Sequence, residues 1–422
     1  MAQKNSGFIS SIEYPYSKSW DKTNTNVKFE VTNINVADIN GIRRCIISQT
    51  ESFSFRTEPY EKNDITIIKN ETALNNQIIC HRIGMIPIHI PDTKFKIDDY
   101  EFIIEVENNN NYAKTITSED FKILKISTNT YLSKEEVQKI FPKDPISKDY
   151  IIITKLKPSY NIINYKLNSY KDELLNSKGK TFHFHCKAKA VLSNGAENSR
   201  FSTVTSISYN NKVDETKADI AEKDYIETEI RIAKEKQLTP RTNEQLSRYF
   251  NTTLRERYYY DNNENEPTKF IFNLESVGVV PPLILVHRGI LCLIDKINNF
   301  LTNIKSLNEN VINIQPSPNL IDGFQITVLE ENDTLGNIIQ ENFYNYFCNK
   351  NNGELDYIGY KRIHPLEEKI IINIKSSVYT QKEDIITNII SIGCLKIIKK
   401  LKDLQKDLEN KKEFSNELKS IQ

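Results

Sequence analysis

The segment His183-Phe184-His185-Cys186 brings together two imidazoles and a thiol, groups that commonly bind zinc. In a strand, successive side chains alternate between the two faces, so His183 and His185 share one face and Cys186 points to the other. The three side chains cannot converge on one ion without a bulge, and no second Cys/His pair lies nearby in the sequence. We therefore expect a strand that binds no metal. The alternative is a metal-dependent enzyme that uses both histidines and a remote ligand.

Two other segments resemble parts of catalytic sites. His364-Pro365-Leu366-Glu367 places an imidazole near a carboxylate, but such pairs are common by chance, and this one precedes a predicted strand. We expect it to have a structural or interface role. Gly336 opens a predicted helix, yet the spacing GxxxxGK[ST] of a phosphate-binding loop is absent. The motifs GxSxG and HExxH are absent too, so we predict no catalytic residue and no cofactor.

Nucleic-acid binding is suggested locally by the run Tyr258-Tyr259-Tyr260 close to Arg255 and Arg257, because aromatic rings and guanidinium groups can stack on bases. The overall charge of the chain argues against nucleic-acid binding. Its 422 residues contain 56 basic and 56 acidic side chains, which gives a formal net charge of zero. A protein that binds the phosphate backbone of nucleic acids usually carries a net positive charge. We expect the tyrosines to pack on a partner protein, and nucleic acid to be contacted only indirectly.

The cysteines and the apolar segments restrict where the protein works. The 6 cysteines are spread along the chain without a CxxC pair, a pattern typical of reduced thiols in an intracellular protein. The first residues lead into no long apolar segment, so we expect no signal peptide. No window approaches 18 uninterrupted apolar residues, so we expect no membrane span. The usage of Asn, Lys, Ile and Tyr is typical of an AT-rich genome.

The same order of predicted elements occurs at both ends of the chain. Alternation and 3–4 spacing of apolar residues predict strand, helix, strand and long helix in each case. The first set has a strand at 27–31 and a helix at 33–48, and after a long interval a strand at 270–274 and a helix at 283–304. The second set has a strand at 324–328, a helix at 335–347, a strand at 370–374 and a helix at 382–408.

Two different kinds of segment fill the interval. Residues 86–210 are mostly β, with strands expected at 102–106, 150–154 and 203–207, and they suggest an inserted domain with its own core. Residues 211–267 are highly charged and contain few large apolar side chains besides tyrosine. We interpret them as a peripheral insertion or linker.

Several motifs in this order resemble the α-like subunits of DNA-directed RNA polymerases. Asn40-Gly41-Ile42-Arg43-Arg44, His81–Pro87 and Glu275–Pro281 resemble the large α-like subunit, whose family includes the bacterial α amino-terminal domain and the third-largest eukaryotic subunit. Asp333–Asn337 and Gly359–Glu367 are similar to its small α-like partner. The chain therefore resembles both halves of the α-like dimer in one polypeptide, an arrangement that suggests a large DNA virus.

The resemblance implies an α+β fold: an RNA polymerase α-like dimerisation fold with an inserted β-rich domain and two halves related by a pseudo-twofold axis. The large α-like domain would comprise residues 1–85 and 268–308, and the inserted domain residues 86–210. The charged segment 211–267 follows, and residues 309–422 would form the small α-like domain. The join between the halves would be the short proline-containing segment 306–319.

The function implied by the resemblance is assembly. The chain would be a non-catalytic scaffold that binds the two largest polymerase subunits and other small subunits, with no membrane partner. It would act in the host cytoplasm or the virion if viral, and in the nucleus if cellular. A free-standing interaction protein that has borrowed the fold is the further alternative.

The resemblance also assigns residues. Contacts with the large subunits would come from Arg43, Arg44, His81 and Arg82. Gly41 lies inside a helix, where glycine costs roughly 1 kcal/mol relative to alanine, so we expect close packing there. The dimer interface would consist of apolar helix residues, namely Val286, Ile290, Leu293, Ile297, Leu301, Leu335, Ile339, Ile389, Leu395 and Ile398.

Overall fold

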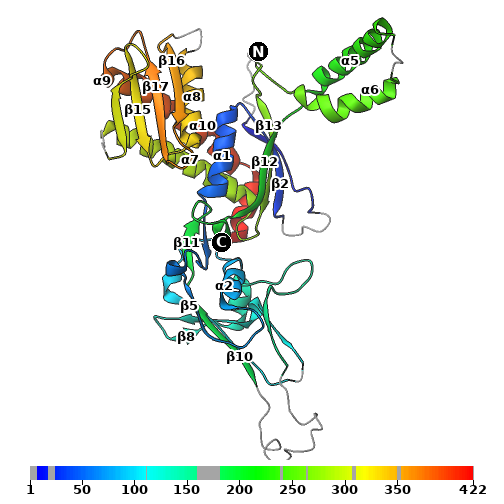
Figure 1. Ribbon diagram of the computed structural model, residues 1–422, viewed down its shortest axis with the longest axis vertical. Helices are drawn as coiled ribbons and strands as arrows, with labels where there is room; N and C mark the ends of the chain where they lie inside the picture. Colours follow the sequence, from blue (N-terminus) through cyan, green and yellow to red (C-terminus); the bar gives the residue numbers. More distant parts are fainter. Residues whose placement is uncertain are drawn as a thin grey trace, which may run out of the picture.

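The computed structural model describes residues 7–17, 24–110, 112–158, 181–237, 241–262, 265–306, 310–348 and 353–421. Two sheets with their helices form the upper part of the molecule, and a third sheet lies below them (Figure 1). A helical arm projects from the upper part. No helix in these residues is long and apolar enough to cross a membrane.

The first sheet is antiparallel and gathers strands from distant parts of the chain. Its order is β1 (Ile9–Glu13), β2 (Asn26–Thr32), β13 (Lys269–Ser276) and β12 (Val204–Asn211). Alternation of apolar residues gives β2 and β13 a common buried face, on which Phe29 lies opposite Phe272 with ring centroids 5.2 Å apart. Two helices pack with this sheet, α1 (Val36–Ser48) and α7 (Pro282–Lys305).

The second sheet is built from one continuous stretch near the C-terminus. Its order is β14 (Ile312–Pro316), β15 (Gly323–Leu329), β17 (Lys369–Lys375) and β16 (Tyr357–Arg362). In both sheets the strands follow the order first, second, fourth, third along the chain. The helices of this part are α8 (Asp333–Phe343), extended by the π-helical η8 (Tyr344–Cys348), then α9 (Lys382–Asp384), the π-helical η9 (Ile385–Ser391), α10 (Ile392–Glu409) and α11 (Lys412–Ile421).

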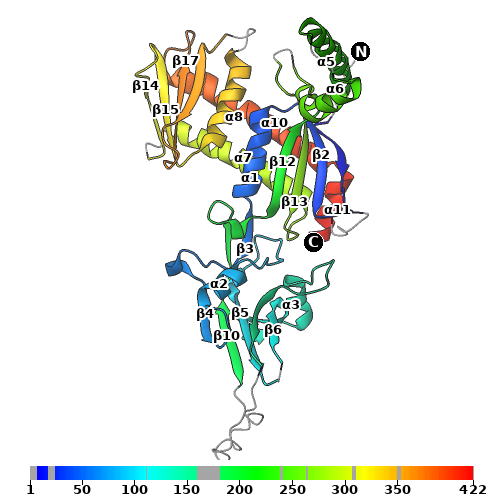
Figure 2. The ribbon, with the colours of Figure 1, turned by 45° about the vertical axis from the view of Figure 1, so that its right-hand side comes forward.

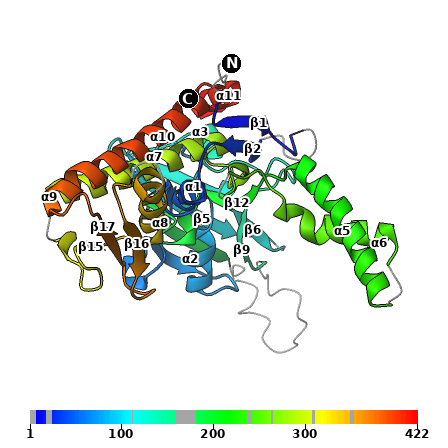
Figure 3. The same ribbon diagram turned by 90° about the horizontal axis from the view of Figure 1, so that it is seen from above.

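A single hydrophobic core connects the two sheets and their helices. Viewed from above, α7 and α10 lie side by side, with α1 and α8 next to them (Figure 3). Each of these helices is apolar on more than one side because it packs within its own unit and against helices of the other unit. The two sheet-and-helix units therefore form one folded body.

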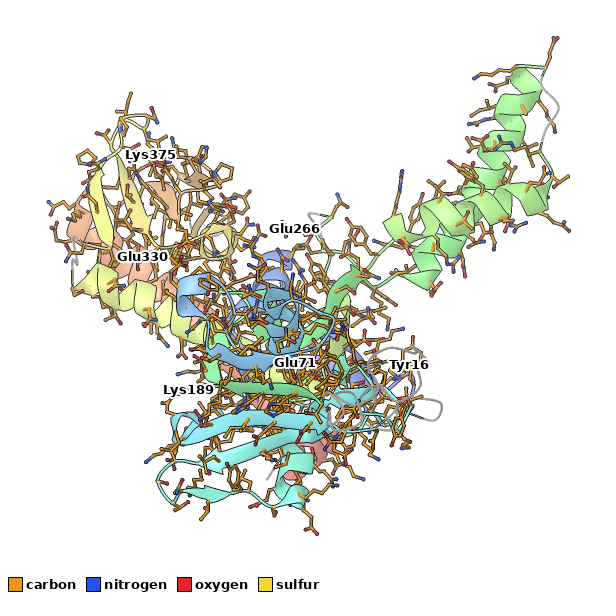
Figure 4. All side chains as sticks on the ribbon, turned by 60° about the horizontal axis from the view of Figure 1, so that its bottom comes forward. Tyr16, Glu71, Lys189, Glu266, Glu330 and Lys375 are labelled. Atoms are coloured by element: carbon orange, nitrogen blue, oxygen red, sulfur yellow. The ribbon has the colours of Figure 1, made fainter. Side chains whose placement is uncertain are left out.

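A separate core holds the lower part. Its five-stranded sheet has the order β4 (Ile65–Asn70), β10 (Phe182–Ala188), β5 (Tyr100–Asn108), β7 (Phe121–Lys125) and β8 (Thr130–Tyr131). Two small sheets accompany it, β3 (Glu51–Ser54) with β11 (Val191–Asn194), and β6 (Lys114–Thr117) with β9 (Ile152–Leu156). The helices are α2 (Asn76–Gly84) and α3 (Lys134–Ile140). Glu71 and Lys189 mark this unit in Figure 4, and Glu330 and Lys375 mark the second sheet.

The boundaries of this lower unit differ from those expected from the sequence. β4 and α2, placed by sequence in the first domain, contribute to the lower core. β12, placed in the inserted domain, pairs with β13 in the first sheet. The chain leaves and re-enters the upper body at Thr50 and Thr203, whose buried hydroxyl oxygens lie 2.7 Å apart. Periodicity identifies a strand but not the sheet that it joins, so the boundaries could not be placed from the pattern.

The charged segment forms a helical arm between β12 and β13. It contains α5 (Glu215–Glu235), α6 (Asn243–Tyr249), the π-helical η6 (Phe250–Leu254) and the short η7 (Arg255–Arg257), and it extends away from the body (Figure 2). Phe250 is fully buried between Tyr225 and Tyr258, with ring centroids 5.7 and 5.6 Å away. Arg255 pairs with three carboxylates of α5, those of Glu215, Asp219 and Glu222.

Candidate assembly interface

The two sheet-and-helix units pack closely at Gly41 on α1. A Cβ atom on this glycine would lie 2.5 Å from Cδ1 of Ile338 on α8 and 3.4 Å from Cδ2 of Leu293 on α7. The first distance is shorter than real Cβ atoms show, so a larger residue at position 41 would force the Ile338 side chain to shift. The close packing expected at Gly41 is confirmed.

The helices α1 and α8 match position by position when they are counted from their caps. Asn35 caps α1 and Asn332 caps α8, each through its side-chain oxygen. The third, fourth, sixth, seventh, tenth and eleventh residues after the cap are buried in both helices. Gly41 and Ile338 are both the sixth residue, so the two side-chain positions that meet at the crossing are equivalent.

The long helices α7 and α10 match in the same way. A Cβ atom on Gly289 of α7 would overlap the side chain of Ile46, which is the eleventh residue after the α1 cap. A Cβ atom on Gly393 of α10 would overlap the ring of Phe343, which is the eleventh residue after the α8 cap. In each unit, therefore, the eleventh residue of the short helix packs against a glycine of the long helix.

Seven residues after each of these glycines stands a lysine that reaches the other unit. Lys400 of α10 forms an ion pair with Asp38 of α1, whose side chain is fully buried. The other oxygen of Asp38 accepts a hydrogen bond of 2.8 Å from the amide of Asn342 on α8, and Lys400 donates to Asn342 at 2.6 Å. Lys296 of α7 pairs with Glu331, just before the α8 cap, at 2.6 Å. Charge is thus neutralised across the interface in both directions.

The C-terminal helix α11 completes the N-terminus of α7. Pro281 caps α7 without a side-chain hydrogen bond, which leaves the first backbone N–H groups without an intrahelical partner. Glu417 of α11 accepts from the N–H groups of Leu283 and Ile284 at 2.8 and 3.3 Å, and from the hydroxyl of Tyr14 at 2.7 Å. Its carboxyl is buried, and this burial raises its pKa to about 7.

Most residues that the sequence assigned to the dimer interface lie in the shared core. Nine are buried there, namely Val286, Ile290, Leu293, Ile297, Leu301, Leu335, Ile339, Ile389 and Ile398. Leu395 is the exception, because its side chain is 54% exposed. The wider turn of the π-helical η9 shifts the register of α10, so that Cys394 and Ile397 continue the buried face instead. The assignment of Leu395 was therefore wrong.

The residues expected to contact large subunits lie on two helices. Arg43 and Arg44 are half-buried on α1, and the guanidinium of Arg43 donates to the side chain of Asn40 at 3.0 and 3.1 Å. His81 and Arg82 are exposed on α2 in the lower unit, where Arg82 donates to the carbonyl of Ile152 at 3.0 Å.

The metal-like segment lies on strand β10. The rings of His183 and His185 are 6.2 Å apart and half-buried, whereas Cys186 is buried on the opposite face. Burial raises the pKa of the Cys186 thiol to about 12, which disfavours the thiolate that a metal would need. In the described part of the chain, no three His, Cys, Asp or Glu residues are placed to hold a metal ion.

The other candidate segments are occupied by contacts within the chain. Tyr258 stacks on Phe250, and Tyr260 lies under the ammonium of Lys269 at 3.8 Å. His364 lies in the turn between β16 and β17, and its Nδ1 accepts from the N–H of Leu366 at 3.1 Å. Neither arrangement is a catalytic constellation.

Sequence reasoning missed the polar residues of this interface. Asp38, Asn342 and Lys400 each stand beside apolar positions of their helices, where a buried polar group needs a partner from another element. One signal was present, since the spacing from glycine to lysine is the same in Gly289 to Lys296 and in Gly393 to Lys400.

Comparison with known proteins gives a consistent picture. Residues 28–297 match the model of the RNA polymerase Rpb3/Rpb11 dimerisation domain. The DNA-directed RNA polymerases I and III subunit RPAC1 of Homo sapiens is 23% identical over 322 residues, which cover 67% of this chain and 82% of that protein. The DNA-directed RNA polymerase subunit Rpo3 of Thermococcus kodakarensis is 30% identical over 95 residues, or 21% of this chain.

The archaeal match is partial on both sides, because it spans 34% of the length of that subunit. The family match is broader: it contains α1, β13 and most of α7, together with the lower unit and the arm between them. It covers more than half of the chain. The chain belongs to the RNA polymerase Rpb3/Rpb11 dimerisation domain family.

Proposed function

We propose that the chain is a non-catalytic assembly subunit of a multisubunit DNA-directed RNA polymerase, and that it carries two α-like halves paired within one polypeptide. The first half comprises β1, β2, α1, β12, β13 and α7, and the second comprises β14, β15, α8, β16, β17 and α10. A pseudo-twofold axis between α1 and α8 relates the halves. Fusion makes their pairing intramolecular, at an effective concentration on the order of mM.

One observation carries this proposal: the same packing occurs twice, in the same order along the chain. Both sheets have the strand order first, second, fourth, third. In each half the short helix places its eleventh residue against a glycine of the long helix, Ile46 against Gly289 and Phe343 against Gly393. Two unrelated units would have no reason to share both the topology and the contact.

The proposed task of the paired halves is to hold the two largest subunits of the polymerase. Arg43 and Arg44 project from α1, and planar guanidinium groups suit carboxylates and backbone carbonyls of a partner. The guanidinium of Arg44 has no hydrogen bond or ion pair within the described residues, so it is available for such a contact. His81 and Arg82 on α2 extend the proposed surface into the lower unit.

Affinity purification of the tagged full-length chain from its native source tests this function. Mass spectrometry should identify two large polymerase subunits and further small ones, and the eluate should incorporate nucleotides in a template-dependent manner. Recovery of the chain alone, without activity, would contradict the assembly role and favour a free-standing interaction protein. Stoichiometric metal in the purified chain would instead favour the enzyme that uses His183 and His185.

The source of the protein is proposed on the same ground. We infer a large DNA virus, because fusion of the two α-like halves is the arrangement that the resemblance associates with such viruses. The subunit would then act in the host cytoplasm or in the virion, whereas a divergent cellular polymerase would place it in the nucleus. The large subunits recovered in the purification identify the polymerase, and with it the compartment.

A further inference from the structure

We infer that the contact between Gly41 and Ile338 makes the pairing of the halves heterotypic, so that each half accepts the other and rejects a copy of itself. This inference rests on the proposed function. The two residues occupy equivalent positions, the sixth after each helix cap, and they meet at the pseudo-twofold axis. At such a position a symmetric pair would place identical residues face to face.

A pair of two second halves would bring Ile338 against Ile338. In the present structure Cδ1 of Ile338 already lies 2.5 Å from where a Cβ of residue 41 would be. A second isoleucine there would add further carbon atoms in the same space. Both side chains would fit only if the helices moved apart or the side chains left their present positions, and overpacking of this kind is destabilising.

A pair of two first halves would fail for the opposite reason. Gly41 against Gly41 would leave a gap where the Ile338 side chain now packs, and cavities of this kind are destabilising. Asp38 would also lose the amide that now binds it, because the residue equivalent to Asn342 is Cys45, the tenth after its cap. A thiol does not replace an amide donor to a buried carboxylate.

Charge alone would not select the partner. Lys296 stands seven residues after Gly289, as Lys400 stands seven after Gly393, so a lysine is available to a carboxylate in either kind of pair. The sizes of the residues at positions 41 and 338 therefore favour the heterotypic pair over the homotypic pairs. The hydrogen bond from Asn342 to Asp38 adds to this preference.

A nicked form of the full-length protein tests the inference. A protease site is inserted between Lys305 and Ile312, the folded chain is cut, and the product is unfolded in urea, refolded by dilution and examined by native mass spectrometry. The uncut chain is treated in parallel. We expect pairs of one N-terminal with one C-terminal fragment to exceed homotypic pairs at least tenfold. The variant Ile338→Gly should raise the share of C-terminal homotypic pairs.

The outcomes separate this inference from the proposed function. Homotypic pairs at their statistical share in the wild-type protein would overturn the heterotypic rule and leave the pairing of halves intact. Fragments that never re-associate, although the uncut chain refolds, would count against the pairing itself.

A second measurement uses the uncut chain and does not depend on refolding of fragments. Gly41→Ile and Ile338→Gly should each lower the midpoint of thermal unfolding, and the double variant should recover at least half of the combined loss. Ile392→Gly is the matched control, because it makes the same change at an exposed site of α10. If the unfolding midpoint of the double variant falls by the sum of the two single decreases or more, Gly41 and Ile338 are not complementary and the inference fails.

Discussion

The carboxylate of Asp38 on α1 is completely buried and is neutralised by the ammonium of Lys400 on α10. Removal of one member of such a pair leaves the other charge without compensation in the core. We predict that Lys400→Met lowers the free energy of unfolding by about 3 kcal/mol. Urea unfolding followed by circular dichroism measures this difference.

The double variant Asp38→Leu with Lys400→Met removes both charges and should recover most of that loss, because no isolated charge remains. Lys399→Met is the control on the exposed side of α10. A loss in the double variant equal to the sum of the single losses would show that the two residues do not act as a pair.

The buried carboxyl of Glu417 predicts a pH dependence. Burial raises its pKa from an ordinary value of 4.5 to about 7 in the folded protein. The folded state therefore binds more protons than the unfolded state between these values, and its stability falls as the pH rises. The stabilisation is fully present below pH 4.5 and is lost by about pH 7. The loss is on the order of 3 kcal/mol.

The variant Glu417→Gln should remove this slope, since glutamine does not titrate. The free energy of unfolding, measured at intervals from pH 5 to 8, provides the test, and Glu413→Gln on the same helix is the control. The prediction concerns the difference between the two variants, because other groups contribute to the slope in both. An equal slope in both variants would exclude Glu417 as its source.

The register of α10 predicts unequal effects for two neighbouring apolar residues. Ile398 is buried, whereas Leu395 is largely exposed. We expect Ile398→Ala to lower the free energy of unfolding by about 2–4 kcal/mol and Leu395→Ala to change it by less than about 0.5 kcal/mol. Denaturant titration distinguishes them. A large loss at Leu395 would restore the regular helical stripe expected from the sequence.

The proposed contact with a large subunit predicts the effect of charge reversal on α1. Arg43→Glu with Arg44→Glu should reduce the yield of co-purified large subunits at least tenfold, because two carboxylates would face groups that accept hydrogen bonds. Arg231→Glu with Lys234→Glu, both exposed on the arm, is the control of equal charge. Thermal unfolding of both variants shows whether the chain stays folded, and an unchanged yield would place the contact elsewhere.

The strongly patterned elements could be predicted from the sequence. The helices α1, α7 and α8 and the strands β2, β13, β15 and β17 lie where the periodicity placed them, since each buries one regular face. In the first and second sheets, the strands that the sequence did not predict, β1, β14 and β16, all lie at an edge. Edge strands pair on one side only and tolerate residues such as Pro316 and Gly359, so their local pattern is weak.

Other features depended on contacts between distant residues. The π-helical segment before α10 leaves Leu395 exposed and Cys394 buried, the reverse of what was expected. The spacing of apolar residues in the sequence gives no sign of this segment. The cap that Glu417 provides for α7 joins residues 134 positions apart. Close packing at Gly41 could be predicted from the sequence, but its partner Ile338 could not, because only the folded chain brings the two helices together.

One polypeptide contains both α7 and β14, so both sheet-and-helix units belong to a single chain. This has a consequence for the amounts in which the two units are synthesised. Separate subunits must be synthesised in matched amounts, and any excess exposes an apolar face that invites aggregation. Here one round of translation delivers both sheets in equal number, and each unit emerges tethered to the surface that will cover it. The ratio of the two is set by the gene rather than by regulation of expression.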